Sequence, residues 1–72
     1  MNRTKDFYQR FIVSCYSRRA TRILNISVIR DDALLVMSAE ELETFVIPAF
    51  DEMLANGRLE KGKEKNQFKL VK

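Results

Sequence analysis

The residues best suited to chemistry in this chain are basic, and they gather in two short stretches. Three lysines alternate with other residues near the C-terminus, and three arginines fall within about one helical turn near the end of the N-terminal third. Such side chains neutralise backbone phosphates, which positions a protein on nucleic acid without reading base sequence. We therefore predict nucleic-acid contacts from six residues: Arg18, Arg19, Arg22, Lys61, Lys63 and Lys65.

Charge is sorted by segment, which the net charge of +3 conceals. Residues 1–30 hold seven bases and one acid, for a charge of +6, and residues 58–72 hold six bases and two acids, for +4. Residues 31–57 hold seven acids and no base. If the fold brings the two basic ends to one surface, they make a cationic patch with an acidic back.

Enzymatic chemistry finds little support in the residue types. The chain has no histidine, and its single cysteine, Cys15, lies on an apolar helical stripe where a buried, inert thiol is expected. The acids at 31–32 and 40–43 are of the type that binds Mg²⁺, but a turn and a capped first helical turn explain them better. We expect no catalytic residue, no metal ion and no cofactor.

The N-terminal half predicts one helix and two strands. Apolar residues at helical spacing predict a helix over about 5–20, with Thr4 as its N-cap. The alternating, β-branched run 23–29 predicts a strand, followed by a polar turn at 30–32. The apolar run 33–37 fits a second strand or a buried helical lead-in, and we favour a strand paired with 23–29. The first strand would turn three side chains to the core: Leu24, Ile26 and Val28.

The C-terminal half predicts a long helix and a β-hairpin. Ser38 and Glu41 form a capping box before an apolar stripe over 42–54. That stripe stays in phase across Pro48, which favours one kinked helix over a second helix opening there. Gly57 is a typical helix stop, and the segments around 58–60 and 67–71 then flank a basic hairpin tip. The predicted fold is a small single α+β domain, residues 1–72, in the order helix–strand–strand–helix–β-hairpin.

The region from Leu54 onward resembles a winged-helix DNA-binding domain. In that family a helix ends near a glycine, and a short strand, a basic wing and a returning strand with alternating apolar residues follow; residues 53–62 and 68–71 have this form. The opening at 38–42 also resembles the start of the family's second helix. Two features depart from the family. Gly57 follows Leu42 by only fifteen positions, too few for two full helices and the turn between them, and the helix that would read DNA carries acids and no base. The resemblance therefore implies backbone contacts from the wing lysines alone: Lys61, Lys63 and Lys65.

Chain size bears on partners. A core built from 72 residues is marginal, and one cysteine allows no internal disulfide, so association with another chain is a second hypothesis. We therefore weigh a nucleic-acid-binding or regulatory domain, for DNA or RNA, against a protein-interaction module such as an inhibitor, an adaptor or a homodimeric subunit. The lone cysteine suits a reducing cytosol, so a cytoplasmic location is expected. No apolar run approaches the roughly 20 residues that cross a bilayer, so no membrane partner is expected.

Overall fold

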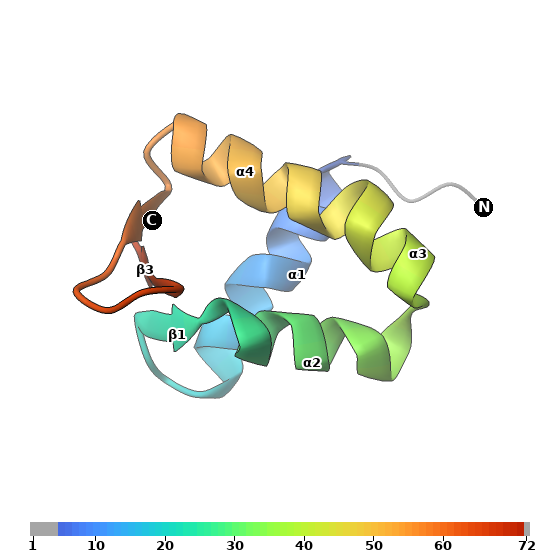
Figure 1. Ribbon diagram of the computed structural model, residues 1–72, viewed down its shortest axis with the longest axis horizontal. Helices are drawn as coiled ribbons and strands as arrows, with labels where there is room; N and C mark the ends of the chain where they lie inside the picture. The colour runs from blue at the N-terminus through green and yellow to red at the C-terminus, as the bar shows by residue number, and fades with distance from the viewer. Residues whose placement is uncertain (1–4, 72) are drawn as a thin grey trace.

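The computed structural model of the protein describes residues 5–71, which form helices packed beside a small antiparallel sheet (Figure 1). This confirms the α+β prediction, although the second predicted strand is helical. The elements follow in this order: α1 (Lys5–Arg18), β1 (Ile23–Asn25), α2 (Ile26–Val36), α3 (Ala39–Glu41), the π-helical η1 (Leu42–Val46), α4 (Ile47–Ala55), β2 (Leu59–Lys61) and β3 (Gln67–Leu70).

The sheet joins two parts of the chain that are far apart in sequence. Its strand order is β1-β3-β2, so the last strand lies in the middle and pairs with both others in antiparallel fashion. Leu24 lies opposite Phe68, and Leu59 lies opposite Leu70, which gives each of the three strands apolar side chains on the core side. Ile23 lies opposite Lys69 on the other face and is 45% exposed. The hairpin of β2 and β3 is the one that the sequence predicts.

The predicted strand over 23–29 is wrong beyond Asn25. The Asn25 side chain accepts a hydrogen bond from the Ser27 backbone N–H at 2.9 Å, which caps a helix at the point where the strand was expected to continue. From there Ile29 and Ala33 are buried one helical turn apart. The predicted turn at 30–32 is therefore mid-helix, and of the three predicted core residues Leu24 is buried while Ile26 and Val28 are half-buried.

The apolar run 33–37 is the end of α2 rather than a strand. Ala33 and Met37 are buried, but Leu34, Leu35 and Val36 are 50%, 82% and 58% exposed. The strand prediction fails because a continuous apolar run of five residues fits a strand and a helix equally well, and its predicted partner beyond Asn25 is itself helical. In the helix, the same run places three of its five side chains toward solvent.

The chain then stays helical from Ala39 to Ala55, as the unbroken apolar phase predicts. Ser38 caps this helix, because its hydroxyl accepts a hydrogen bond from the Glu41 backbone N–H at 3.1 Å. Pro48 has no N–H to donate, and the turn before it is π-helical, with the Ile47 N–H bonded to the Leu42 carbonyl. The predicted stop is also confirmed, since Gly57 has a φ of 84°.

The core lies between α1, α2, the long helix over 39–55 and the sheet. From α1 it takes Ile12, Cys15 and Tyr16, each no more than 1% exposed, and the Tyr16 hydroxyl donates to the Phe68 carbonyl at 3.0 Å. Gln9 is a buried polar residue with partners on both sides: it donates to Glu52 at 3.0 Å and accepts from Arg58 at 2.7 Å. The predicted N-cap, Thr4, lies outside the described residues.

Candidate nucleic-acid interface

The three predicted hairpin lysines come together on the loop between β2 and β3. Lys61, Lys63 and Lys65 are all exposed, and residues 61–68 line a hollow of about 410 Å³. Backbone bonds hold the loop: the Gly62 N–H donates to the Gln67 carbonyl at 2.6 Å, and the Gln67 N–H donates to the Glu64 carbonyl at 3.1 Å. All three lysines thus line one concave surface.

These lysines are placed to bind an external partner, because no carboxylate of the described residues pairs with them. Within residues 5–71, no carboxylate lies within ion-pair distance of Lys61, Lys63 or Lys65. The loop's own acid is Glu64, so residues 61–66 have three bases against one acid. An anion that enters the hollow therefore meets a local excess of positive charge without first displacing an intramolecular carboxylate.

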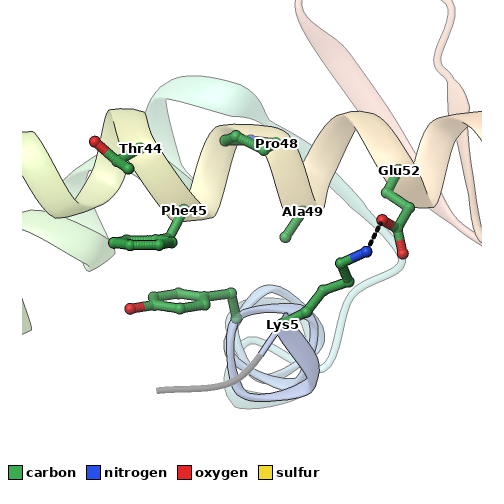
Figure 2. Close-up of a pocket in the computed structure, with 7 residues that line it drawn as sticks. Lys5, Thr44, Phe45, Pro48, Ala49 and Glu52 are labelled. Atoms are coloured by element: carbon green, nitrogen blue, oxygen red, sulfur yellow. Dashed lines mark ion pairs between the residues drawn. The ribbon is translucent and has the colours of Figure 1, made fainter. Parts of the chain in front are cut away.

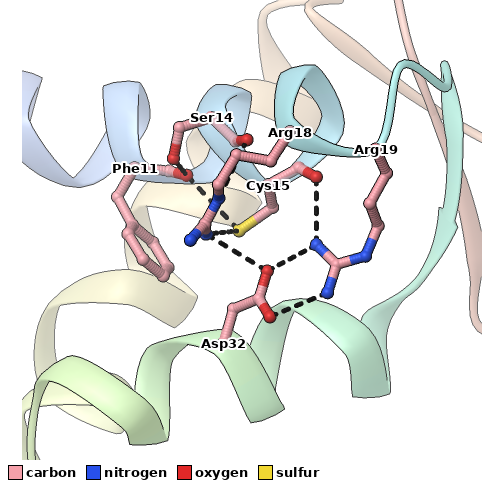
Figure 3. A network of polar contacts seen from close by, with 6 residues as sticks. All are labelled: Phe11, Ser14, Cys15, Arg18, Arg19 and Asp32. Carbon is pink, nitrogen blue, oxygen red and sulfur yellow. Dashed lines mark hydrogen bonds and ion pairs between the residues drawn. The ribbon is translucent and has the colours of Figure 1, made fainter.

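Arg18 and Arg19 have a different environment, because both bind the carboxylate of Asp32 on α2 (Figure 3). Arg19 approaches it with two nitrogens at 2.7 and 2.9 Å, and Arg18 with one at 3.2 Å. The Asp32 side chain is only 9% exposed, and hydrogen bonding from Arg19 lowers the pKa of its carboxyl below the ordinary range. Two of the six predicted phosphate contacts are thus engaged in joining the end of α1 and the turn after it to α2.

Asp32 is the important residue that sequence reasoning missed. The sequence predicts a polar turn at 30–32, because the strand predicted over 23–29 leaves no helix that would carry Asp32 toward α1. Once α2 is recognised as a helix, Asp32 falls on the same face as Ile29 and Ala33, the buried positions. An acid on a buried stripe would have pointed to a basic partner on a neighbouring element.

Arg22 and the hairpin tip lie on the same sheet but at opposite ends of β3. The Leu70 N–H donates to the Arg22 carbonyl at 2.7 Å, which places Arg22 beside the end of β3 that is farther from the tip. At the other end, the Ile26 N–H donates to the Asn66 carbonyl at 2.8 Å, so the start of α2 adjoins the tip. Arg22 is exposed, and Lys69 is an exposed base on the strand between them.

Other chemistry has little support among the described residues. Burial raises the pKa of the Cys15 thiol to about 11, so the group is protonated at neutral pH. No set of three or more acidic, cysteine or histidine side chains within 5–71 is placed to hold a metal ion. None of the helices in this part of the chain is both long and apolar enough to cross a membrane.

Comparison with protein-family models, with curated proteins and with solved structures finds no match.

Proposed function

We propose that the protein is a non-enzymatic nucleic-acid-binding domain that contacts the phosphate backbone through the hairpin loop. The observation that carries the proposal is the set of Lys61, Lys63 and Lys65, exposed around one hollow with no carboxylate partner in residues 5–71. Arg22 and Lys69 extend the positive surface along the sheet. Arg18 and Arg19 are not part of this proposal as direct contacts, because Asp32 already binds them.

The placement of the lysines supports backbone contact rather than base reading. Lys61 ends β2, and Lys63 and Lys65 follow on the loop, so all three line one hollow and can contact neighbouring phosphates together. Lysine ammonium groups are point charges, suited to phosphates, whereas base reading uses bidentate groups such as arginine, asparagine or glutamine in a groove. We therefore propose binding that depends on charge and shape more than on sequence.

A winged-helix-like arrangement is also consistent with this proposal. Helix α2, the short link at Met37–Ser38 and the helix over 39–55 form a helix–turn–helix order, and β2 and β3 follow as a wing. In helix–turn–helix proteins the second helix enters the major groove. Here the exposed residues of that helix include Glu40, Glu43 and Asp51, and it has no base. Repulsion from phosphates disfavours that docking, so the wing is assigned the contact.

The test is the salt dependence of binding to fluorescein-labelled duplex DNA and single-stranded RNA, followed by anisotropy. Each phosphate contact contributes about 0.9 to the log–log slope for duplex DNA. The triple variant Lys61→Ala/Lys63→Ala/Lys65→Ala should therefore lower the slope by up to about 3 and weaken binding strongly at low salt.

The matched control replaces with alanine three bases that already have carboxylate partners: Lys5, Arg10 and Arg30. It has the same net charge as the triple variant and should retain most of the slope. Equal loss in both variants would show that only the net charge matters, and absence of binding at low salt would refute the proposal.

A further inference from the structure

A second hollow lies between α1 and the long helix, on a different part of the surface from the hairpin loop. Its volume is about 360 Å³, and its lining includes Tyr8, which is 3% exposed. Ala49, also 3% exposed, lies in the wall formed by the long helix (Figure 2). Phe45 and Pro48 line it as well, and both are exposed. The small Ala49 side chain leaves room beside these larger ones, so the hollow can take an apolar side chain.

The residues around this hollow are held by contacts on both helices. The rings of Tyr8 and Phe45 stack, with centroids 5.2 Å apart and planes 10° from parallel. The Tyr8 hydroxyl donates to Glu41 at 2.8 Å, and Lys5 forms an ion pair with Glu52, also at 2.8 Å. A side chain that enters therefore meets a surface whose shape is largely set beforehand, which lowers the entropic cost of binding.

The long helix that forms one wall of the hollow has no base and five acids over residues 39–55: Glu40, Glu41, Glu43, Asp51 and Glu52. Two of these acids are already paired, Glu52 with Lys5 and Glu43 with Arg30, and the lining itself is neutral because it holds both Lys5 and Glu52. Glu40 and Asp51 are exposed, so the negative charge beside the hollow comes from the wall rather than from the lining. Phe45 is 49% exposed, and an exposed phenyl face attracts cations. Negative charge around an apolar hollow complements a ligand that is basic and carries an apolar anchor.

We propose that this hollow docks a basic peptide segment of a partner protein, with one apolar side chain seated between Phe45 and Pro48. Basic neighbours of that side chain would then face the carboxylates of the long helix. A nucleic-acid backbone is negatively charged, unlike a basic peptide, so the carboxylates of the long helix would repel it. The hairpin tip of a second copy, residues 61–66, has basic residues but no apolar side chain to seat. The surface is thus assigned to a protein partner, and it is independent of the nucleic-acid proposal.

The test uses a random library of twelve-residue peptides displayed on phage, selected on the folded protein. Enriched peptides are synthesised with a fluorescein label and titrated by anisotropy. We expect them to combine lysine or arginine with an apolar residue. Thr44 lines the hollow and is exposed, so Thr44→Arg should weaken their binding by about tenfold or more.

Ala55→Arg is the matched control. Ala55 is exposed on the same helix and does not line the hollow. Each new arginine follows an acid by four residues, Glu40 in one case and Asp51 in the other, so both variants gain the same kind of helix pair. Ala55→Arg should change peptide affinity by less than about twofold, since the long-range charge effect is shared and screened by salt.

Four results would overturn the proposal. The first two are a selection that enriches no peptide and one that enriches acidic peptides. The third is equal peptide affinity of Thr44→Arg and wild type, and the fourth is an equal loss of peptide affinity in Thr44→Arg and Ala55→Arg. Sedimentation of the protein alone addresses a second copy: a dimer that Thr44→Arg dissociates would assign the surface to self-association. DNA binding lost in Thr44→Arg but kept in Ala55→Arg would assign it to nucleic acid. The hairpin triple variant should bind the peptides as wild type does, so the two proposals can fail separately.

Discussion

Replacing Asp32 by asparagine should destabilise the protein by about 2 kcal/mol. The carboxylate accepts bonds at 2.7, 2.9 and 3.2 Å from Arg19 and Arg18, while its own side chain is only 9% exposed. Hydrogen bonds to charged groups contribute about 1.5–3 kcal/mol each when buried. Because both guanidinium groups are substantially exposed and water can replace part of what they lose, we expect the total effect to resemble one such bond, about 2 kcal/mol.

That loss is large for this chain. A domain of this size has an unfolding free energy on the order of 4–10 kcal/mol, and each kcal/mol shifts Tm by about 4–8 °C. Urea unfolding followed by circular dichroism at 222 nm measures the difference directly. The control is Asp31→Asn, an exposed neighbour with the same change in charge, which should stay within about 0.5 kcal/mol of wild type.

The difference between wild type and Asp32→Asn should also depend on pH. The native pKa of Asp32 is lowered, so its stabilisation is fully present above the ordinary value of 3.8 and is lost as pH falls through the native pKa. The free-energy gap should be constant between about pH 5 and 7 and should narrow below about pH 4. A cost below about 0.5 kcal/mol at pH 7, or a gap that stays constant into strong acid, would refute the ion-pair explanation.

Two further predictions concern the buried thiol of Cys15 and the end of the long helix at Gly57. Cys15 is fully buried with its pKa raised to about 11, so it should react with a disulfide reagent at pH 8 only as fast as the protein opens. Unfolding in guanidinium should raise the reaction rate of Cys15 to that of an accessible thiol. Asp32→Asn should speed the reaction of the native protein by roughly 30-fold, because it lowers stability by about 2 kcal/mol. A native rate equal to the unfolded rate would contradict burial. Gly57→Ala should lower the free energy of unfolding in urea by about 1 kcal/mol, because φ at this position is 84°. No atom lies within 4 Å of the added Cβ, so the backbone conformation alone accounts for this cost. Gly57→Asn should cost less, and no loss for alanine would show that the backbone there is not strained.

Local signals predicted much of the fold. The helical spacing in the first sixteen residues, the cap at Ser38 and the stop at Gly57 each depend on neighbours within about one turn, and the structure contains them all. The hairpin likewise follows from alternation on both sides of a polar loop. These signals succeed because local geometry and tertiary packing favour the same conformation.

The failures occur where local preference and packing differ. The β-branched run 23–29 favours a strand, but the Asn25 cap and the burial of Ile29 and Ala33 favour a helix from Ile26 onward. That error also hid the partner of Arg18 and Arg19, because Asp32 reaches them only from a helix. The candidate site was therefore half predictable: the hairpin lysines are local to one loop, whereas the roles of the arginines depend on contacts across the fold.

The most direct test of the nucleic-acid proposal is a ¹⁵N–¹H correlation spectrum recorded during titration with a short DNA duplex. The account predicts that the shifts will concentrate on residues 61–67 and extend along the sheet to Lys69 and Arg22, and that they will weaken as salt is raised. Shifts centred on the long helix over 39–55, with the hairpin unchanged, would contradict it. So would a spectrum that does not change at low salt.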